Sequence, residues 1–149
     1  MQAIIFVGVQ ATGKSTFFKE RFFDTHVRIS LDLLKTRHRE RIFLEACLKS
    51  GQKFVVDNTN SAIEDRKRYI VPAKETGFAI IGYYFESKIA DALQRNKQRL
   101  LEQQIPDKGI RGTYHKLQIP YLSEGFDKLY YVKIGSQGGF IVEEWQNEI

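Results

Sequence analysis

The sequence predicts an α/β fold in which helices cover both faces of a five-stranded parallel sheet. Short apolar runs alternate with helical segments along the whole chain, which is the pattern that builds such sheets. The first apolar run, residues 3–7, is continuous rather than alternating, as in strands that are buried on both faces. A length of 149 residues fits one compact domain, so we expect residues 1–149 to form one unit.

Five apolar segments are expected to form the strands. Each is short and is bounded by turn-forming or polar residues. The expected strands are residues 3–7, 27–29, 54–56, 78–85 and 129–134. The tail that follows, with Phe140, Val142 and Trp145, is expected to pack back as a short helix.

The intervening segments are expected to form helices, at residues 14–23, 31–49, 61–76, 87–101 and 109–118. In the first helix, Phe18 and Phe22 share one face and should belong to the core. In the second helix, Thr36 is a candidate break. The third helix should begin with a capping box formed by Ser61 and Glu64.

The composition is that of an ordinary globular protein, with 42% apolar and 28% charged residues, which excludes wholesale disorder and a fibrous repeat. Lys and Arg exceed Asp and Glu by 23 − 18 = 5, and this favours anionic partners. The basic residues cluster at 35–41, 66–68 and 95–99. Such clusters suit a nucleic-acid surface or are solvated helix faces, and a bound nucleotide alone would account for the net charge.

Cys47 is the one cysteine, so no disulfide partner is expected, and a buried thiol in a reducing compartment follows. The first apolar run ends at Gly8, too early for a signal peptide or a membrane span, so we expect a cytoplasmic protein with no membrane contact. His26, His38 and His115 are scattered without metal-ligand spacing, which argues against a zinc site.

Residues 8–15 read Gly-Val-Gln-Ala-Thr-Gly-Lys-Ser, the P-loop pattern, between an apolar strand and a helix. The loop amides and the helix N-terminus attract phosphate, Lys14 neutralises the outer phosphates, and Ser15 offers its hydroxyl to Mg²⁺. A P-loop alone does not separate kinases from GTPases or motor ATPases. GTPases and motor ATPases, however, usually need a longer chain. The expected nucleotide-binding residues here are Gly8, Ala11, Thr12, Gly13, Lys14, Ser15 and Thr16.

Two aspartates follow strands at the carboxyl edge of the sheet, where ligands of open α/β folds bind. Asp57 ends the third strand and is either a metal-side carboxylate or a turn-forming cap. Asp32 follows the second strand and either accepts the proton of an attacking hydroxyl or complements a helix N-terminus. The residues alone leave both alternatives open.

A basic helix followed by a polar segment is typical of a lid. Arg95 and Arg99 are four residues apart and are expected on one helix face, ahead of the polar residues 102–108. A lid at about residues 87–108 would use these arginines to stabilise charge on a transferring phosphoryl group. The alternative is a solvated basic surface.

Over most of its length the chain resembles the kinase domain of bacteriophage polynucleotide kinase and the related AAA_33-type kinases. The segments that carry the resemblance are 8–16, 30–32, 55–60 with Glu64 and Arg66, and 95–99. The resemblance implies a P-loop NTPase three-layer sandwich with strand order 2-3-1-4-5 and a helical lid. It also implies ATP with Mg²⁺ as the donor and the 5'-hydroxyl of RNA or DNA as the acceptor.

The resemblance further implies a role for each matching residue. The implied roles are catalysis by Asp32 as general base with Lys14 and Arg99, nucleotide binding by Arg95 and Arg99, metal binding by Ser15 and Asp57, and acceptor binding by Lys35, Thr59 and Asn60.

Two positions depart from the family pattern. Lys35 stands where the family often has an arginine for the acceptor's phosphate, and Asn58 stands where the family has an aspartate, with the carboxylate at Asp57 instead. The phosphatase domain of the bacteriophage enzyme has no counterpart, so end healing in both directions is not expected. The alternatives are a small-molecule kinase of the gluconate, shikimate or antibiotic phosphotransferase kind and a non-catalytic nucleotide-binding module.

Overall fold

The computed structural model describes residues 1–146, which contain one mixed sheet. The strands are β1 (Gln2–Val7), β2 (Val27–Ile29), β3 (Phe54–Val56), β4 (Ala79–Phe85), β5 (Lys128–Ile134) and β6 (Phe140–Glu144). Their spatial order is β2-β3-β1-β4-β5-β6, and the first five are parallel. The expected order 2-3-1-4-5 is therefore confirmed, with a sixth strand added at the edge.

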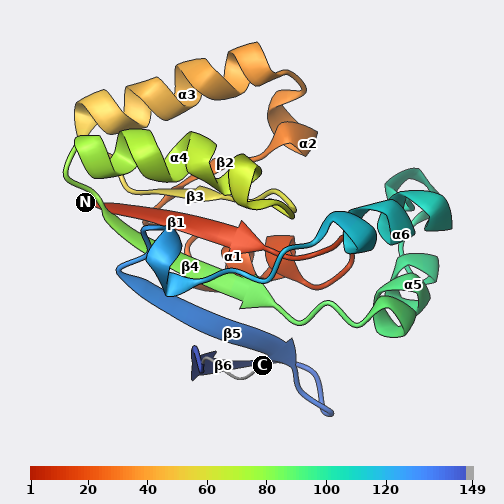
Figure 1. Ribbon diagram of the computed structural model, residues 1–149. Helices are drawn as coiled ribbons and strands as arrows, with labels where there is room; N and C mark the ends of the chain where they lie inside the picture. Colours follow the sequence, from red (N-terminus) through yellow and green to blue (C-terminus); the bar gives the residue numbers. More distant parts are fainter. Residues whose placement is uncertain (147–149) are drawn as a thin grey trace.

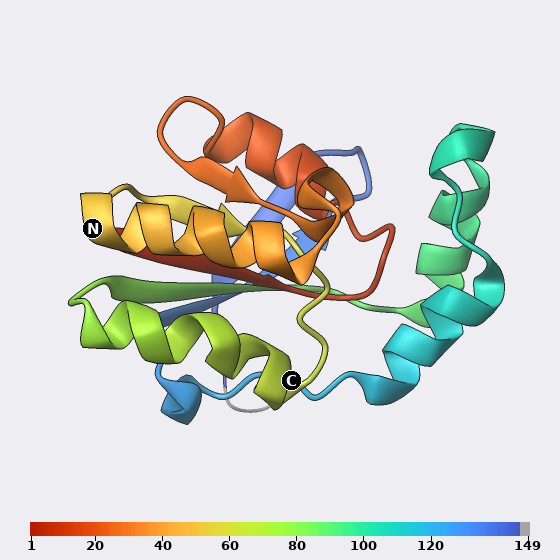
Figure 2. The ribbon, with the colours of Figure 1, turned by 90° about the horizontal axis from the view of Figure 1, so that it is seen from above.

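The helices lie on both faces of the sheet and beyond one of its ends. They are α1 (Lys14–Arg21), α2 (Leu31–Leu34), α3 (Arg37–Ser50), α4 (Ile63–Glu75), α5 (Ile89–Lys97) and α6 (Asp107–Lys116), with short 3-10 turns η1 (Leu101–Gln103) and η2 (Leu122–Glu124). Figure 1 shows α3 and α4 side by side above the sheet. Figure 2 shows α5 and α6 standing apart from α3 and α4, beyond the carboxyl ends of the central strands.

Two apolar layers form the core, one on each side of β1. Alternate β1 residues such as Ala3 and Ile5 pack with residues of α3 and α4 in one cluster. Ile4 and Phe6 pack with the α1 phenylalanines in the other. The Phe6 and Phe17 rings lie 5.8 Å apart and both are almost completely buried, and burying one such side chain stabilises the fold by about 1.5–3 kcal/mol.

The tail is a strand, so the prediction of a short helix was wrong. β6 pairs antiparallel with β5, from Ile134 opposite Phe140 to Tyr130 opposite Glu144. Phe140 and Val142 alternate with Ile141 and pack against the cluster around α1, which is the period of a strand rather than of a helix. Gly138 and Gly139 adopt positive φ angles of 81° and 73°, which lets the chain turn back onto β5.

Several helix boundaries differ from the expectation or refine it. α1 ends at Arg21 rather than at residue 23, and α6 spans Asp107–Lys116 rather than residues 109–118. The candidate break at Thr36 is confirmed, because α2 ends at Leu34 and the Thr36 hydroxyl caps α3 by accepting a hydrogen bond from Arg39 N. The third predicted helix has its N-cap at Ala62 rather than at Ser61, and α4 begins at Ile63. Asp65 Oδ2, not Glu64, accepts the bond from the backbone N–H of Ala62. α5 ends at Lys97, so Arg99 does not share its face with Arg95.

Within the part of the chain that the structure describes, no helix is long and apolar enough to span a membrane.

Candidate nucleotide and acceptor site

The P-loop joins β1 to α1 in a conformation that its glycines permit. Gly13, just before α1, has φ 92°, and a Cβ there would lie 2.8 Å from Phe140 Cε1 on β6. Gly8 donates its backbone N–H to Thr59 O at 2.9 Å, which ties the loop to the segment after β3. A larger residue at position 13 would therefore be strained in its backbone and would displace the Phe140 ring.

Lys14 lies folded under the loop with only 8% of its surface exposed. Its ammonium donates hydrogen bonds to Gly8 O at 2.9 Å and to Val9 O at 2.6 Å. Burial lowers the pKa of Lys14 to about 8; Asp57 and Asp32 oppose this shift, whereas Arg99 adds to it. An anionic phosphate beside Lys14 would raise this pKa again, because an opposite charge favours the charged form of a lysine.

Ser15, Asp57 and Arg28 form a hydrogen-bonded triangle next to the loop. Ser15 Oγ donates to Asp57 Oδ2 at 3.0 Å, and Arg28 donates from Nε to the same oxygen at 2.9 Å and from Nη2 to Ser15 Oγ at 3.1 Å. The structure thus brings together the two residues that were expected to bind the metal. Sequence reasoning missed Arg28, although a charged residue inside the short apolar strand β2 was the available signal.

A polar cavity of about 270 Å³ opens at the carboxyl ends of β1, β2 and β3. Asp32 lies on its wall at the start of α2, and Arg99 reaches it from beyond α5. The predicted site residues that line it are Ala11, Lys14, Ser15, Asp32, Asp57, Thr59 and Arg99. Residues from distant parts of the sequence thus meet around a space that a phosphoryl group and a hydroxyl could share.

Asn58 holds the backbone that carries Asp32. Its Oδ1 accepts a hydrogen bond from Leu31 N at 2.9 Å, and its Nδ2 donates to Glu40 Oε2 at 3.1 Å and to the Tyr69 hydroxyl at 3.2 Å. Arg37 donates to Glu40 Oε1 at 2.8 Å and to the same hydroxyl at 3.1 Å. Sequence reasoning missed Glu40, because this residue belongs to no sequence motif that would have indicated a buried carboxylate.

A second hollow, of about 350 Å³, lies on the other side of the P-loop. Arg95 and Arg99 line it from the expected lid, and Gly13 and Thr16 line it from the loop and α1. Phe140 completes the wall from β6. Two adjoining spaces, which have Ala11 and Arg99 in common, are therefore lined by most of the predicted nucleotide-binding residues: Ala11, Gly13, Lys14, Ser15, Thr16, Arg95 and Arg99. Gly8 and Thr12 line neither space, and nucleotide binding by them stays a prediction.

Two expected acceptor residues lie outside the cavity lining. Lys35 ends α2 with an unusual φ of 74° and is exposed. Asn60 is 4% exposed, has φ 45°, and donates its side-chain amide to Phe6 O at 2.8 Å. Asn60 therefore supports the end of β1, and acceptor binding by these two residues stays a prediction.

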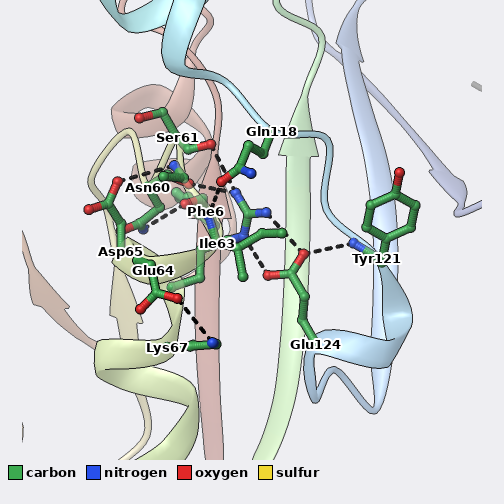
Figure 3. Close-up of polar contacts among 12 residues, drawn as sticks. Phe6, Asn60, Ser61, Ile63, Glu64, Asp65, Lys67, Gln118, Tyr121 and Glu124 are labelled. Carbon is green, nitrogen blue, oxygen red and sulfur yellow. Dashed lines mark hydrogen bonds and ion pairs between the residues drawn. The ribbon is translucent and has the colours of Figure 1, made fainter.

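Arg66 is fully buried, which excludes it from a basic surface. It donates to Glu124 from Nε at 2.8 Å and from Nη2 at 2.9 Å, and its Nη1 donates to Asn60 O and Ser61 O at 2.9 and 3.2 Å. Figure 3 shows Glu124 reaching from η2 toward Asn60 and Ser61. The pair fixes the segment after β3, whose Thr59 carbonyl accepts from the P-loop.

The segment after α5 is braced by one buried amide. Asn96 donates to Ile105 O at 2.5 Å and accepts from Ile105 N at 3.0 Å, and Gln104 donates to Arg99 O at 2.9 Å. Gln10 of the P-loop donates to the Thr113 hydroxyl of α6 at 3.0 Å. The backbone of Arg99 is therefore held within the segment between α5 and α6, and α6 is tied to the P-loop.

The sheet order, the loop after β1 and the helices beyond the strand ends place the chain among P-loop nucleotide-binding proteins with a kinase-like fold. The family model AAA_33, described as an AAA domain, matches residues 35–115, which is more than half of the 149 residues. The chain belongs to this family, and the resemblance to polynucleotide kinase-like P-loop kinases is confirmed.

The bifunctional polynucleotide phosphatase/kinase of Schizosaccharomyces pombe is 30% identical over 130 residues. The match covers 84% of this chain and 32% of the relative, so the chain spans about a third of the length of the relative.

Solved structures with the same fold include proteins of different activities. Kti12 from Chaetomium thermophilum, in complex with ADP-AlF3, has a TM-score of 0.66 and 16% identity, and the match covers 88% of each chain. A gluconokinase from Sinorhizobium meliloti 1021 has a TM-score of 0.62 and 17% identity, over 89% of this chain and 82% of that one. At such identities the likeness shows the fold and leaves the acceptor open.

Proposed function

We propose that this protein transfers the γ-phosphoryl group of ATP to the 5'-hydroxyl of a polynucleotide. The observation that carries the proposal is that Asp32, Lys14 and Ser15 line one polar cavity. The relative from Schizosaccharomyces pombe supports a polynucleotide acceptor, because its name includes a polynucleotide kinase activity.

In this reaction Asp32 accepts the proton of the attacking hydroxyl. Its carboxylate is exposed to the cavity and carries no ion pair within residues 1–146, so an acceptor can approach it. The backbone behind it is held through Leu31 N by Asn58. A fixed carboxylate beside an incoming hydroxyl acts as a general base, which typically contributes about 10²- to 10⁴-fold to the rate.

Lys14, Arg95 and Arg99 stabilise the phosphates. Lys14 leaves its loop carbonyls for phosphate oxygens, while Arg99 approaches the transferring group from the lid. Positive charge at these points stabilises the equatorial oxygens in the transition state. Arg95 faces the second hollow, where the remainder of the nucleotide would lie.

Ser15 and Asp57 are suited to hold Mg²⁺, because hydroxyl and carboxylate oxygens are the ligands this ion prefers. When bound, Mg²⁺ neutralises charge on the β- and γ-phosphates.

The test is incubation of the protein with γ-labelled ATP, Mg²⁺ and 5'-hydroxyl RNA or DNA oligonucleotides. The variant is Asp32→Asn. The control is Asp24→Asn, because Asp24 is exposed and lies outside the cavity. We expect labelled 5' ends with the parent and the control, and a loss of at least about 100-fold with Asp32→Asn at unchanged ATP affinity. ATP binding without labelled ends would exclude the polynucleotide acceptor and favour a small-molecule one.

A further inference from the structure

A hollow of about 470 Å³ runs between α3 and α4, on the face of the sheet that these helices cover. Its rim carries Arg37 and Arg41 from α3 and Arg68 from α4. Its floor is apolar, with Leu44, Leu48 and Pro72. Two basic clusters that are separate in the sequence, 35–41 and 66–68, therefore meet at one place, which we call the α3/α4 hollow.

The charges of the α3/α4 hollow are only partly neutralised within the protein. Arg37 is paired with Glu40, and the second carboxylate oxygen of Glu40 is taken by Asn58. Among residues 1–146, Arg41 and Arg68 form no ion pair and are exposed. Glu45 is the remaining acidic residue, and it also lines a neighbouring depression with Lys49 near the far end of α3.

The α3/α4 hollow shares a wall with the cavity that holds Asp32. Asn58 lines that cavity, and its amide donates to Glu40, which lines the hollow. Along the chain, α2 with Asp32 leads into α3 through Lys35 and Thr36 alone. A strand whose 5' end lies at Asp32 would therefore meet the arginine rim as it leaves the cavity.

We propose that the α3/α4 hollow binds the sugar-phosphate backbone of a single-stranded acceptor, downstream of the nucleotide whose 5'-hydroxyl is phosphorylated. The inference rests on the proposed function. Unpaired arginines at the rim contact phosphates, and the apolar floor packs against sugars and unstacked bases. Contacts of this kind read no base sequence, so RNA and DNA strands bind alike.

The test compares acceptor lengths in an Arg41→Gln/Arg68→Gln variant. With a 12-nucleotide RNA or DNA acceptor we expect KM to rise about tenfold at unchanged kcat. The slope of log(kcat/KM) against log[salt] should become shallower by about 1.4, because two phosphate contacts are lost. With a dinucleotide, whose single phosphate adjoins the nucleoside held in the cavity, we expect both constants to match the parent. This result would also show that the variant is folded.

The matched control is Arg39→Gln/Lys67→Gln, which removes the same charge from exposed positions of the same helices outside the hollow. Its KM for the 12-nucleotide acceptor should stay within twofold of the parent. Glu45→Gln should lower that KM, because it removes the unpaired acid of the hollow.

The outcomes separate the two proposals. If the parent labels polynucleotides and the Arg41→Gln/Arg68→Gln variant equals its control at every length, the hollow does not bind the acceptor, although the proposed function stands. If the parent labels neither RNA nor DNA, the proposed function itself fails.

Discussion

At the scale of single residues, Asp57 and Asn58 explain one departure from the family pattern. Asn58 accepts from Leu31 N and donates to Glu40, a combination that an amide provides and an ionised carboxylate does not. A carboxylate at position 58 would face that of Glu40 and be repelled. Asp57 instead presents its carboxylate to Ser15 and Arg28.

Arg28 occupies the two oxygens that we propose for the metal, so it should compete with Mg²⁺. ATP should stabilise the protein thermally, and this stabilisation should depend on Mg²⁺. We expect Arg28→Gln to lower the Mg²⁺ concentration at half-maximal stabilisation by about fivefold. This factor corresponds to about 1 kcal/mol, the size expected for a partly exposed ion pair. The measurement is Tm against Mg²⁺ at fixed ATP. Arg21→Gln, on the surface of α1, is the control. A higher Mg²⁺ requirement would instead make Arg28 a positioning residue for Asp57.

At the scale of elements, the ends of the strands are held by side chains from far away in the sequence. Glu124 of η2 anchors Arg66 of α4, and Arg66 in turn holds two carbonyls of the segment after β3. Glu124 also accepts from Tyr121 N, which fixes its own turn (Figure 3). The network connects the turn that precedes β5 to the segment after β3, whose Thr59 carbonyl accepts a hydrogen bond from the P-loop.

Breaking this buried pair should be costly. We expect Arg66→Leu to lower the free energy of unfolding by about 3–5 kcal/mol, because it leaves the Glu124 carboxylate buried without its partner. Equilibrium urea unfolding measures the change. Lys67→Gln, an exposed neighbour on α4, should change it by less than about 0.5 kcal/mol. The double variant Arg66→Leu/Glu124→Leu should be more stable than Arg66→Leu, and an equal or larger loss would refute the explanation.

At the scale of the whole molecule, the segment from α5 to α6 forms a separate layer beyond the carboxyl ends of the parallel strands (Figures 1 and 2). This layer rests on the P-loop through a small apolar cluster in which Ala92 and Ile110 enclose Val9. Because so few buried residues join this layer to the P-loop, we propose that it is a lid that opens and closes over nucleotide.

Nucleotide binding should therefore slow amide hydrogen exchange in residues 89–116 several-fold, as Arg95 and Arg99 engage phosphates and hold the lid. Amides of β1 and β3, already in the centre of the sheet, should change little. The Arg99→Ala variant should lose most of this slowing. The Lys97→Ala variant should keep it, because Lys97 is exposed and lines neither the polar cavity nor the second hollow beside the P-loop. Unchanged exchange in α5 and α6 with ATP bound would exclude lid closure.

Much of the fold could be predicted because its signals are local. The apolar runs gave the five parallel strands, and Thr36 gave the break between α2 and α3. Two predictions failed. The alternation of apolar residues in the tail was too short to distinguish a strand from a helix. Arg99 was expected to be helical, although α5 ends at Lys97. A helix end depends on neighbouring contacts, here the brace by Asn96, as much as on its own residues.

By itself the sequence determined the P-loop, because a fixed spacing of glycines, Lys14 and Ser15 between a strand and a helix is a complete local signal. The family and the strand order followed from the resemblance that this loop shares with residues 30–32, 55–60 and 95–99. Only the tertiary structure decided which charges are buried, paired or free. Arg66 and Arg68 are two residues apart, yet one is an internal anchor and the other lies on the rim of a hollow. That difference depends on which side of α4 faces the sheet and on a glutamate 58 residues away, and no local pattern carries this information.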